Sequence, residues 1–436
     1  MLNSIKKNIF LLVIVVMALT PAYLFAAEKH QAAKKSILDI LPFKDPAFRF
    51  QCLWRFGSIA AGGGDFAEML TAARDVIDNN HESWYQPWSA MADHTSDAAS
   101  KYLQNGNLES AQAAFFRAAN YYRAAEIYVS SKDPRGEATW KKGRNCFLKA
   151  CELSKGLIKL VEIPFENTVL PAYWCRVDDS GKKRPLLIVQ TGLDGTAEDL
   201  YFIVAPYAVK RGYNCLIFEG PGQGEVIRIK KMPFRHNWET VVTPVLDYAL
   251  KLPEVTESKI ALIGYSMAGY LVPRAMAFEH RIKYCVVDSG VLSVFDGLMT
   301  KFAPEIKTLV DSDSAEKKLN QIIAEEQKKR SDIDQFINQM LWTFGVDSPF
   351  NLFRKLKTFN LKDCLDKIDC EMLVIGSVND QVAGSFEQAK LFYAALKSPK
   401  TYLEFSDAEG AQFHCQIGSP MNSIEQILNW VDKRLK

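Results

Sequence analysis

Apolar residues recur at every third or fourth position between about residues 48 and 160, and this spacing is typical of helices that bury one face. No strand pattern interrupts the region and no repeat period runs through it, so we expect a helical domain over 48–160 rather than a solenoid. The predicted helices are Asp65 to Ile77, Ser96 to Leu103, Leu108 to Tyr128 and Arg135 to Ile158, with turns at Gly106-Asn107 and Asp133-Pro134.

After Pro164 the pattern changes to short runs rich in branched and aromatic residues, most of them separated by helical stretches. This alternation predicts an α/β fold over 161–436 with a mostly parallel sheet covered on both faces, and functional residues beyond the carboxyl ends of its strands. A helical insert at about 298–344 precedes one of the last strands. The predicted strands are Leu160 to Ile163, Leu170 to Val177, Leu186 to Gln190, Asn214 to Phe218, Ile260 to Ile263, Tyr284 to Val287, Met372 to Ile375 and Tyr402 to Phe405.

The first residues form a separate segment. Lys6-Lys7 precede an uncharged apolar run from Ile9 to Ala27, which predicts a secretory signal over 1–27 and a periplasmic or secreted protein. The small-residue cleavage pattern is imperfect because Leu24 or Phe25 would stand three positions before the cut. An uncleaved N-terminal anchor, which would keep the protein near a membrane, is therefore the competing interpretation.

Charge and cysteine content narrow the classes of partner. The chain has 436 residues, with 53 basic against 51 acidic ones, and no basic face with interleaved aromatics, so nucleic acid is not an expected partner. The nine cysteines show no short framework spacing, and Cys364 with Cys370 is the only local pair that suggests a bridge. No Cys/His cluster has zinc spacing and no phosphate-binding motif is complete, so we expect neither metal nor cofactor.

The hexapeptide Gly264-Tyr265-Ser266-Met267-Ala268-Gly269 carries the clearest chemistry. It follows an apolar strand and opens a helical segment, which is the setting of a nucleophile elbow. Such a turn exposes the serine hydroxyl above the sheet and aims a helix N-terminus at it. Ser266 is therefore the candidate nucleophile.

A serine hydroxyl needs a base to take its proton and a carboxylate to orient that base. Of the six histidines only His414 follows the last predicted strand, where the order serine, acid, histidine requires the base. Asp380 is our candidate acid because it stands on the turn after the strand Met372 to Ile375. Asp407, on the loop after the last strand, and Asp288, at the end of another strand, are the alternatives.

Acyl transfer also needs N–H donors for the negative charge that develops on the carbonyl oxygen. The residue after the nucleophile, Met267, should supply one backbone donor. The segment Gln190-Thr191-Gly192-Leu193-Asp194-Gly195 has the required strand-then-glycine layout, so Leu193, next to Gly192, is the candidate for the second. The other glycine-rich turn, Phe218 to Glu225, lacks a phosphate-binding pattern and is interpreted as the rim of the site.

Together these segments resemble α/β-hydrolases with an N-terminal helical domain, the class that includes fermentation-respiration-switch-like esterases and 2,6-dihydroxypseudooxynicotine hydrolase. The resemblance spans about residues 50 to 436 and implies the roles of Ser266, Asp380 and His414 given above. Two departures are Ala268 at the fifth elbow position and Pro273 inside the following helix. The motifs that carry the resemblance are Gly192-Leu193-Asp194-Gly195, Phe218 to Gly224, the elbow, Asn379-Asp380, Glu409-Gly410-Ala411 and His414-Cys415-Gln416.

Three functions compete at this point. The first is a serine hydrolase that cleaves an ester or related acyl substrate through an acyl-enzyme. The second is a carbon–carbon bond hydrolase for an aromatic or polyketide-like diketone, a reaction that the resemblance also implies. The third is a non-catalytic binding protein that uses the helical domain to recruit a partner. The expected partner of the first two is a small acyl or ketone molecule, and assembly as a homo-oligomer is left open.

Overall fold

The computed structural model describes residues 40–436, and the predicted signal or anchor over 1–27 lies outside the described residues. Each run predicted as a strand lies within or overlaps a strand of a single sheet. The strands are β1 (Ile158–Phe165), β2 (Thr168–Cys175), β3 (Arg184–Gln190), β4 (Asn214–Phe218), β5 (Val255–Tyr265), β6 (Tyr284–Asp288), β7 (Glu371–Ser377) and β8 (Lys400–Phe405).

The sheet has eight strands in the order β1-β2-β4-β3-β5-β6-β7-β8. Strand β2 pairs antiparallel with β1 and β4, and all the other pairs are parallel. The predicted α/β fold with a mostly parallel sheet is therefore confirmed. Strands β3 to β7 consist largely of buried branched residues, as expected of strands covered on both faces.

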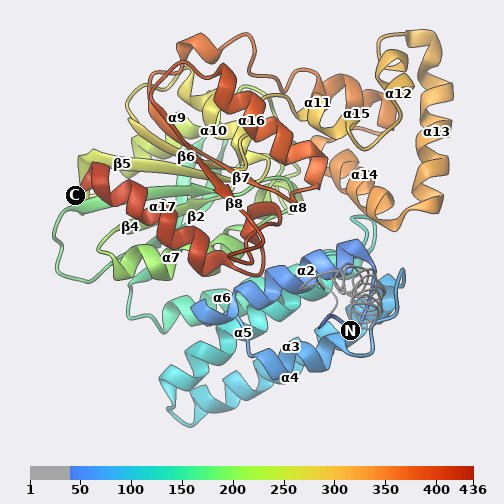
Figure 1. The fold of residues 1–436 in the computed structure, drawn as a ribbon. Coiled ribbons are helices and arrows are strands. Elements are labelled where there is room, and N and C mark those ends of the chain that lie inside the picture. Colours follow the sequence, from blue (N-terminus) through green and yellow to red (C-terminus); the bar gives the residue numbers. More distant parts are fainter. Residues whose placement is uncertain (1–39) are drawn as a thin grey trace, which may run out of the picture. The chain divides into compact units, whose positions relative to one another are not determined.

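Helices cover both faces of the sheet (Figure 1). Helices α9 (Glu239–Ala249), α10 (Ala268–Met276) and α16 (Ser385–Ala395) pack on one face, and α7 (Ala197–Lys210) and α17 (Pro420–Leu435) on the other. The short helix α8 (Gly224–Arg228) follows β4. Because parallel strands need crossover connections, this arrangement brings the carboxyl ends of β3, β5, β6 and β7 to one edge.

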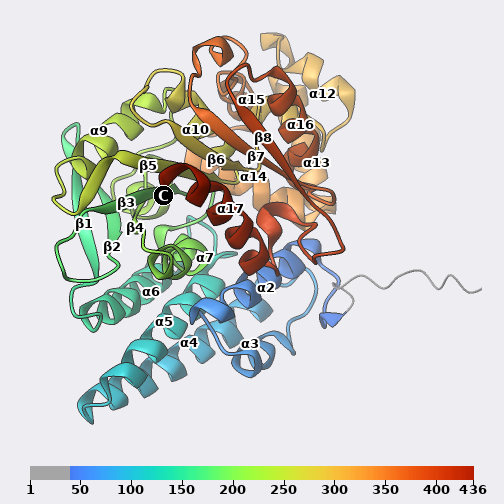
Figure 2. The same cartoon turned by 60° about the vertical axis from the view of Figure 1, so that its left-hand side comes forward.

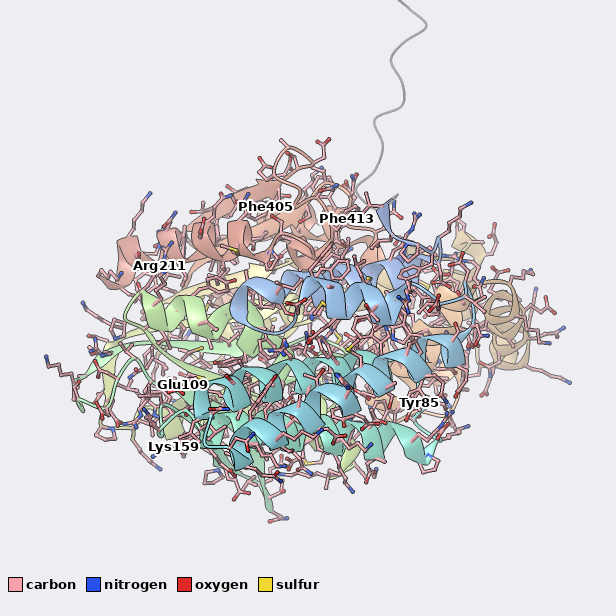
Figure 3. The ribbon with its side chains drawn as sticks, turned by 90° about the horizontal axis from the view of Figure 1, so that it is seen from below. Tyr85, Glu109, Lys159, Arg211, Phe405 and Phe413 are labelled. Atoms are coloured by element: carbon pink, nitrogen blue, oxygen red, sulfur yellow. The ribbon has the colours of Figure 1, made fainter. Side chains whose placement is uncertain are left out.

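The helical region contains α2 (Pro46–Gly57), α3 (Phe66–Ala73), α4 (His81–Gln104), α5 (Leu108–Glu126) and α6 (Pro134–Glu152). Helix α4 begins fifteen residues before its predicted start at Ser96, and its first half contains Pro87 and buries Trp84 and Trp88. The hairpin of α4 and α5 is long: Tyr85 lies near one end of it and Glu109 near the other (Figure 3). Helix α6 ends at Glu152 because the chain turns there into β1.

The predicted insert before the acid-bearing strand is also present, and it is longer than 298–344. It consists of α11 (Val294–Met299), α12 (Pro304–Leu309), α13 (Glu316–Lys329), α14 (Ser331–Phe344) and α15 (Pro349–Leu356), which lie together at one end of the sheet (Figure 1). Helix α14 buries Ile333, Ile337 and Met340 at three-to-four spacing, the pattern of an amphipathic helix.

Residues 42–436 form one compact unit, which holds both the helical region and the sheet (Figure 2). Buried ion pairs join the two parts: Arg55 and Arg123 pair with Asp199 of α7 at 2.8 and 2.9 Å, and Arg144 pairs with Glu198 at 2.9 Å. The division at residue 160 therefore stays a prediction from the sequence pattern.

The nine cysteines, all within the described part of the chain, are buried and free. Cys364 and Cys370, the pair that suggested a local bridge, are thus separate thiols in this structure. Within residues 40–436 no helix is both long and apolar enough to span a bilayer, and no group of His, Cys, Asp and Glu side chains is arranged to hold a metal ion.

Candidate active site

Ser266 stands on a sharp turn between β5 and α10. Its backbone φ is +58°, a left-handed conformation that non-glycine residues rarely adopt, and its N–H donates to the carbonyl oxygen of Asp288 at 2.5 Å. The flanking glycines leave no room for a side chain: a Cβ at Gly264 would lie 2.7 Å from the carbonyl oxygen of Ala268, and one at Gly269 would lie 1.6 Å from that of Ser289. This is the backbone of a nucleophile elbow.

The two departures noted in the sequence fit this turn. Ala268 is fully buried at the start of α10, where its methyl group is accommodated. Pro273 has no N–H to donate to the carbonyl four residues earlier, that of Gly269. The N–H of Val291, from the segment after β6, donates to that oxygen at 3.2 Å instead. The Gly269 carbonyl that Pro273 cannot pair with therefore has a partner, and this hydrogen bond holds the β6–α11 segment against α10.

Three of the predicted residues form a hydrogen-bonded chain across three loops. His414 Nε2 lies 2.8 Å from Ser266 Oγ, and His414 Nδ1 lies 2.7 Å from Asp380 Oδ2. Since a carboxylate only accepts hydrogen bonds, Nδ1 carries a proton, and in the neutral imidazole Nε2 is then the acceptor that faces the serine hydroxyl. The side chains of His414 and Asp380 are almost fully buried.

Asp380 is fixed by two further donors. Ser289 Oγ donates to its Oδ2 at 2.9 Å, and the N–H of Val382 donates to its Oδ1 at 3.0 Å. Of the two alternative acids, Asp407 lies on an exposed turn after β8. The carboxylate of Asp288 accepts from Gln416 Nε2 at 3.0 Å. Asp380, rather than either of them, thus contacts the imidazole.

Burial and neighbouring charges shift the pKa values of the ionisable groups at the site. Burial disfavours the imidazolium form of His414, but the adjacent Asp380 carboxylate outweighs it and holds the pKa of His414 well above its usual value. Behind the elbow, burial raises the pKa of Asp288 to about 7. The Asp380 carboxylate therefore makes the neutral imidazole of His414 more basic than an ordinary histidine.

The loop after β3 passes directly over the elbow. A Cβ at Gly192 would lie 2.7 Å from the backbone nitrogen of Met267 and 2.8 Å from Ser266 Cβ, so only glycine fits there. Leu193 and Met267 both line the cavity into which Ser266 faces. The two backbone positions expected to supply donors for an oxyanion are therefore brought to the same place as the serine.

That cavity, hereafter the chamber, contains about 490 Å³ of space between atoms, part of which is open to solvent. Among the described residues that line it none is Asp, Glu, Lys or Arg, and much of its wall comes from the insert. Phe50 of α2 lies beside His414, with ring centroids 6.2 Å apart, so the helical region also reaches the site. The apolar lining includes Val291, Val294, Leu298, Phe336, Met340 and Val382.

The sequence did not identify Ser289, Phe336 or Met340 as site residues. Ser289 follows β6 directly, so the rule that functional residues collect at the carboxyl ends of strands was a usable signal. Phe336 and Met340 stand four positions apart on α14, a spacing that indicates a buried helix face but not what that face covers.

Comparisons with known proteins indicate the family of this chain. A family model described as "Esterase FrsA-like" matches residues 72–347. A 20-hydroxy-prefusarin hydrolase of Gibberella moniliformis is 30% identical over 409 residues, which cover 89% of this chain and 97% of that protein. The hydrolyase poxO of Penicillium oxalicum is 31% identical over 352 residues, covering 77% and 83%.

Among solved structures, that of 2,6-dihydroxy-pseudo-oxynicotine hydrolase superposes with a TM-score of 0.68 at 19% identity and covers 87% of this chain and 95% of that one. At that level of identity the likeness concerns the fold, and it extends over the helical region as well as the sheet.

Proposed function

Because this chain belongs to the FrsA-like esterase family of α/β-hydrolases, we propose that it cleaves an ester or related acyl compound with Ser266 as nucleophile, His414 as base and Asp380 as orienting acid. The observation that carries the proposal is the unbroken chain of contacts from Ser266 to His414 and on to Asp380, at 2.8 and 2.7 Å. Nucleophile and base within hydrogen-bond reach, with the base held by a third group, is the signature of covalent catalysis.

The reaction follows from these contacts. His414 Nε2 takes the hydroxyl proton as Ser266 Oγ attacks the carbonyl carbon, while Asp380 holds the imidazolium. The carbonyl oxygen becomes an oxyanion and accepts hydrogen bonds from the N–H groups of Leu193 and Met267. The intermediate collapses to the acyl-enzyme as His414 returns the proton to the departing alkoxide. Water, deprotonated by His414, then releases the acid and restores the serine.

The chamber supports an uncharged, largely apolar substrate. Its lining offers aromatic and aliphatic surface but no charged side chain other than that of His414 when protonated, and burying an unpaired charge is expensive.

The same chamber is also compatible with a second reaction, the hydrolysis of a carbon–carbon bond beside a ketone. An aromatic or polyketide-like diketone carries no charge and would meet the same serine and the same apolar wall. The two reactions separate in a substrate screen: turnover of diketones without turnover of esters would favour the second.

Turnover of p-nitrophenyl acetate and butyrate tests the first proposal. We expect the unmodified protein to hydrolyse them and Ser266→Ala to lose at least about 10³-fold in kcat, since removing a catalytic serine leaves little beyond the oxyanion donors. Ser398→Ala is the matched control, because Ser398 is also buried and its hydroxyl has no hydrogen-bond partner. Equal turnover by Ser266→Ala would exclude Ser266 as the nucleophile.

We also propose that the protein is exported, on the strength of the apolar segment over 9–27. Mass spectrometry of the mature N-terminus decides between the two fates of that segment. Cleavage near Ala27 agrees with a secretory signal, whereas an intact N-terminus recovered with membranes agrees with an anchor.

A further inference from the structure

The loop that would supply the second oxyanion donor is held from outside by side chains of other segments. This oxyanion loop (residues 191–195) connects β3 to α7. Gln223 Nε2 donates to the carbonyl oxygens of Thr191 and Gly192 at 2.5 and 3.0 Å. Arg123 of α5 donates from its Nη2 to the carbonyl oxygen of Asp194 at 2.6 Å. Three of the five carbonyl groups of the loop thus have a side-chain donor.

Gln223 is itself fixed. It precedes α8 on the turn after β4 and is 1% exposed. Its Oε1 accepts from the N–H of Gly220 at 2.9 Å, while its Nε2 faces the loop. Because oxygen and nitrogen of the amide are both engaged, the group cannot rotate without breaking hydrogen bonds in a buried place.

The contact to Gly192 determines the direction of the next N–H. In a trans peptide the carbonyl of one residue and the N–H of the following residue point in opposite directions. Since the Gly192 carbonyl points at Gln223, the N–H of Leu193 points away from it. The elbow is close to this peptide, since a Gly192 Cβ would lie only 2.7 Å from the Met267 nitrogen.

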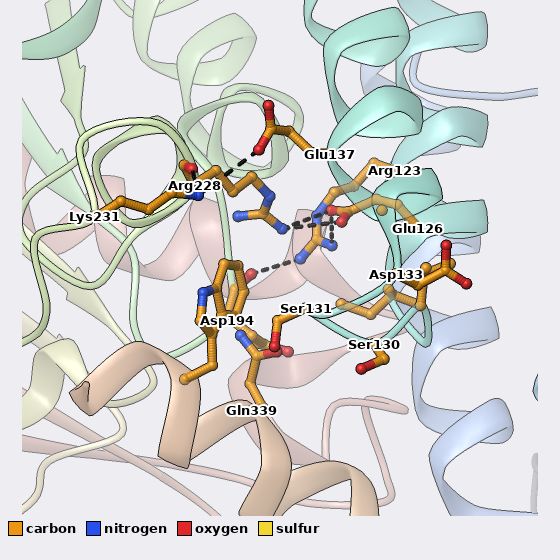
Figure 4. A pocket seen from close by; sticks show the side chains of 14 residues that line it. Arg123, Glu126, Ser130, Ser131, Asp133, Glu137, Asp194, Arg228, Lys231 and Gln339 are labelled. Carbon is orange, nitrogen blue, oxygen red and sulfur yellow. Dashed lines mark hydrogen bonds and ion pairs between the residues drawn. The ribbon is translucent and has the colours of Figure 1, made fainter. Parts of the chain in front are cut away.

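Arg123 holds the far end of the loop with an equally constrained group. Its Nε donates to Asp199 at 2.9 Å and its Nη1 to Glu126 at 2.6 Å, which leaves Nη2 for the loop. Arg228 pairs with the same Glu126 at 2.9 Å, and Figure 4 shows both arginines converging on that carboxylate while Arg123 also reaches Asp194. All three nitrogens of the Arg123 guanidinium are therefore occupied.

We propose that Gln223 and Arg123 are positioning residues that aim the N–H of Leu193 at the oxyanion. The inference rests on the proposed acyl transfer, in which negative charge develops on the carbonyl oxygen at this point. A donor held in place before the reaction needs no reorganisation when the charge appears, and this is why preorganised donors favour the transition state over the bound substrate. The helical region, through α5, thereby contributes to the chemistry of the sheet.

The test compares Gln223→Met, which removes the donor, with the unmodified enzyme on p-nitrophenyl acetate. We expect kcat to fall about 10²-fold, near the lower end of what loss of an oxyanion donor costs, with KM changed by less than about 3-fold. Inhibition by phenylboronic acid, whose adduct with a serine is tetrahedral, should weaken by a similar factor. The thermal midpoint should stay within about 3 °C.

Matched variants keep the result interpretable. Gln223→Glu removes the Nε2 donor but retains the oxygen that accepts from Gly220. Gln190→Glu is its control, because it makes the same amide-to-carboxylate change at the end of β3, where Gln190 Nε2 has no hydrogen-bond partner to lose. Arg123→Lys and Arg144→Lys form a second pair, since both arginines are buried to the same degree in ion pairs but no hydrogen bond joins Arg144 to the loop. Only the first member of each pair should lose kcat and boronate affinity together.

The inference is overturned if Gln223→Met, Gln223→Glu and Arg123→Lys fold and keep the kcat of their controls. It is also overturned if their kcat falls only in step with the thermal midpoint. Labelling by a fluorophosphonate separates this outcome from failure of the proposed function: an unmodified enzyme that is not labelled contradicts the serine mechanism, whereas normal labelling of all the variants contradicts the positioning role alone.

Discussion

At the scale of single residues, the proposed mechanism makes the reactivity of Ser266 depend on the protonation of His414. Asp380 makes that imidazole more basic than an ordinary histidine despite its burial. The raised pKa has a measurable consequence, because the reaction needs the neutral form of the base.

We expect kcat/KM to rise with pH through a midpoint above about 6.5, the ordinary value for histidine. Activity is present above the pKa of His414 and is lost as the pH falls through it. Asp380→Asn removes the charge that raises this pKa, so the midpoint should move to lower pH and kcat should fall about 10⁴-fold. A pH–rate profile of both proteins checks this, and an unchanged midpoint would contradict the role given to Asp380.

Asp288 offers a test through stability rather than activity. Burial raises its pKa to about 7, so between pH of about 4 and 7 the folded protein holds a proton that the unfolded chain releases. Stability should therefore decline as the pH rises across this interval and level off above it. In Asp288→Asn, which keeps the oxygen that Gln416 contacts, denaturant titrations should show a flatter pH dependence. An equal slope in both proteins would contradict this.

Whether the sequence could predict a site residue depends on whether a local pattern or a contact with a distant segment identifies that residue. Ser266, Asp380 and His414 were identified from their order along the chain and from their places after strands, both of which are local properties. Ser289, Gln223 and Arg123 act through contacts with segments 31 to 91 residues away, and no local pattern marks such partners. The sequence therefore predicts the candidate reacting groups better than the side chains that contact them.

At the scale of elements, close packing of the elbow against its neighbours keeps Ser266 in place. The strands were predictable because buried parallel strands are continuous apolar runs, a signal that needs no partner. The first half of α4 was not predictable, because Pro87 and the polar residues around it weaken the helical pattern. The helix is stabilised there by the tertiary packing of Trp84 and Trp88.

Gly269→Ala tests the elbow packing. A Cβ there would overlap the Ser289 carbonyl oxygen at 1.6 Å, and backbone cannot yield as a side chain does, so we expect destabilisation of at least about 2 kcal/mol together with loss of turnover. Gly136→Ala in α6 is the control, because its nearest neighbour would lie at 3.4 Å and alanine favours a helix. Chemical denaturation measures both, and equal stability of the two variants would contradict the packing argument.

At the scale of the whole molecule, the helical region and the sheet share a buried charge network. Asp199 of α7 accepts from Arg55 of α2 and Arg123 of α5, and all three side chains are nearly inaccessible to solvent. Burial opposes the charge of Asp199, but the two guanidinium groups outweigh it and hold its pKa below the usual range. The spacing of apolar residues predicted the helices. It could not predict the ion pairs between the helical region and the sheet, because partners on distant segments produce no repeating pattern in the sequence.

Asp199→Asn should cost about 3 to 5 kcal/mol, since it leaves two buried arginines without their shared partner. Asp247→Asn, which removes one of the two carboxylate partners of Arg281 at an exposed site, should cost about 0.5 kcal/mol. For the unmodified protein the contribution of Asp199 is present at neutral pH and is lost as the pH falls below about 4. Similar losses in the two variants would contradict the stabilising role given to the network.

Site-resolved labelling with a fluorophosphonate tests the central claim most directly, because it requires nucleophile, base and oxyanion donors at once. The account predicts one adduct per chain, located on Ser266, no adduct on Ser266→Ala, and labelling of His414→Ala slowed by at least about 10²-fold. Full labelling of Ser266→Ala, or no labelling of the folded unmodified protein, would contradict it.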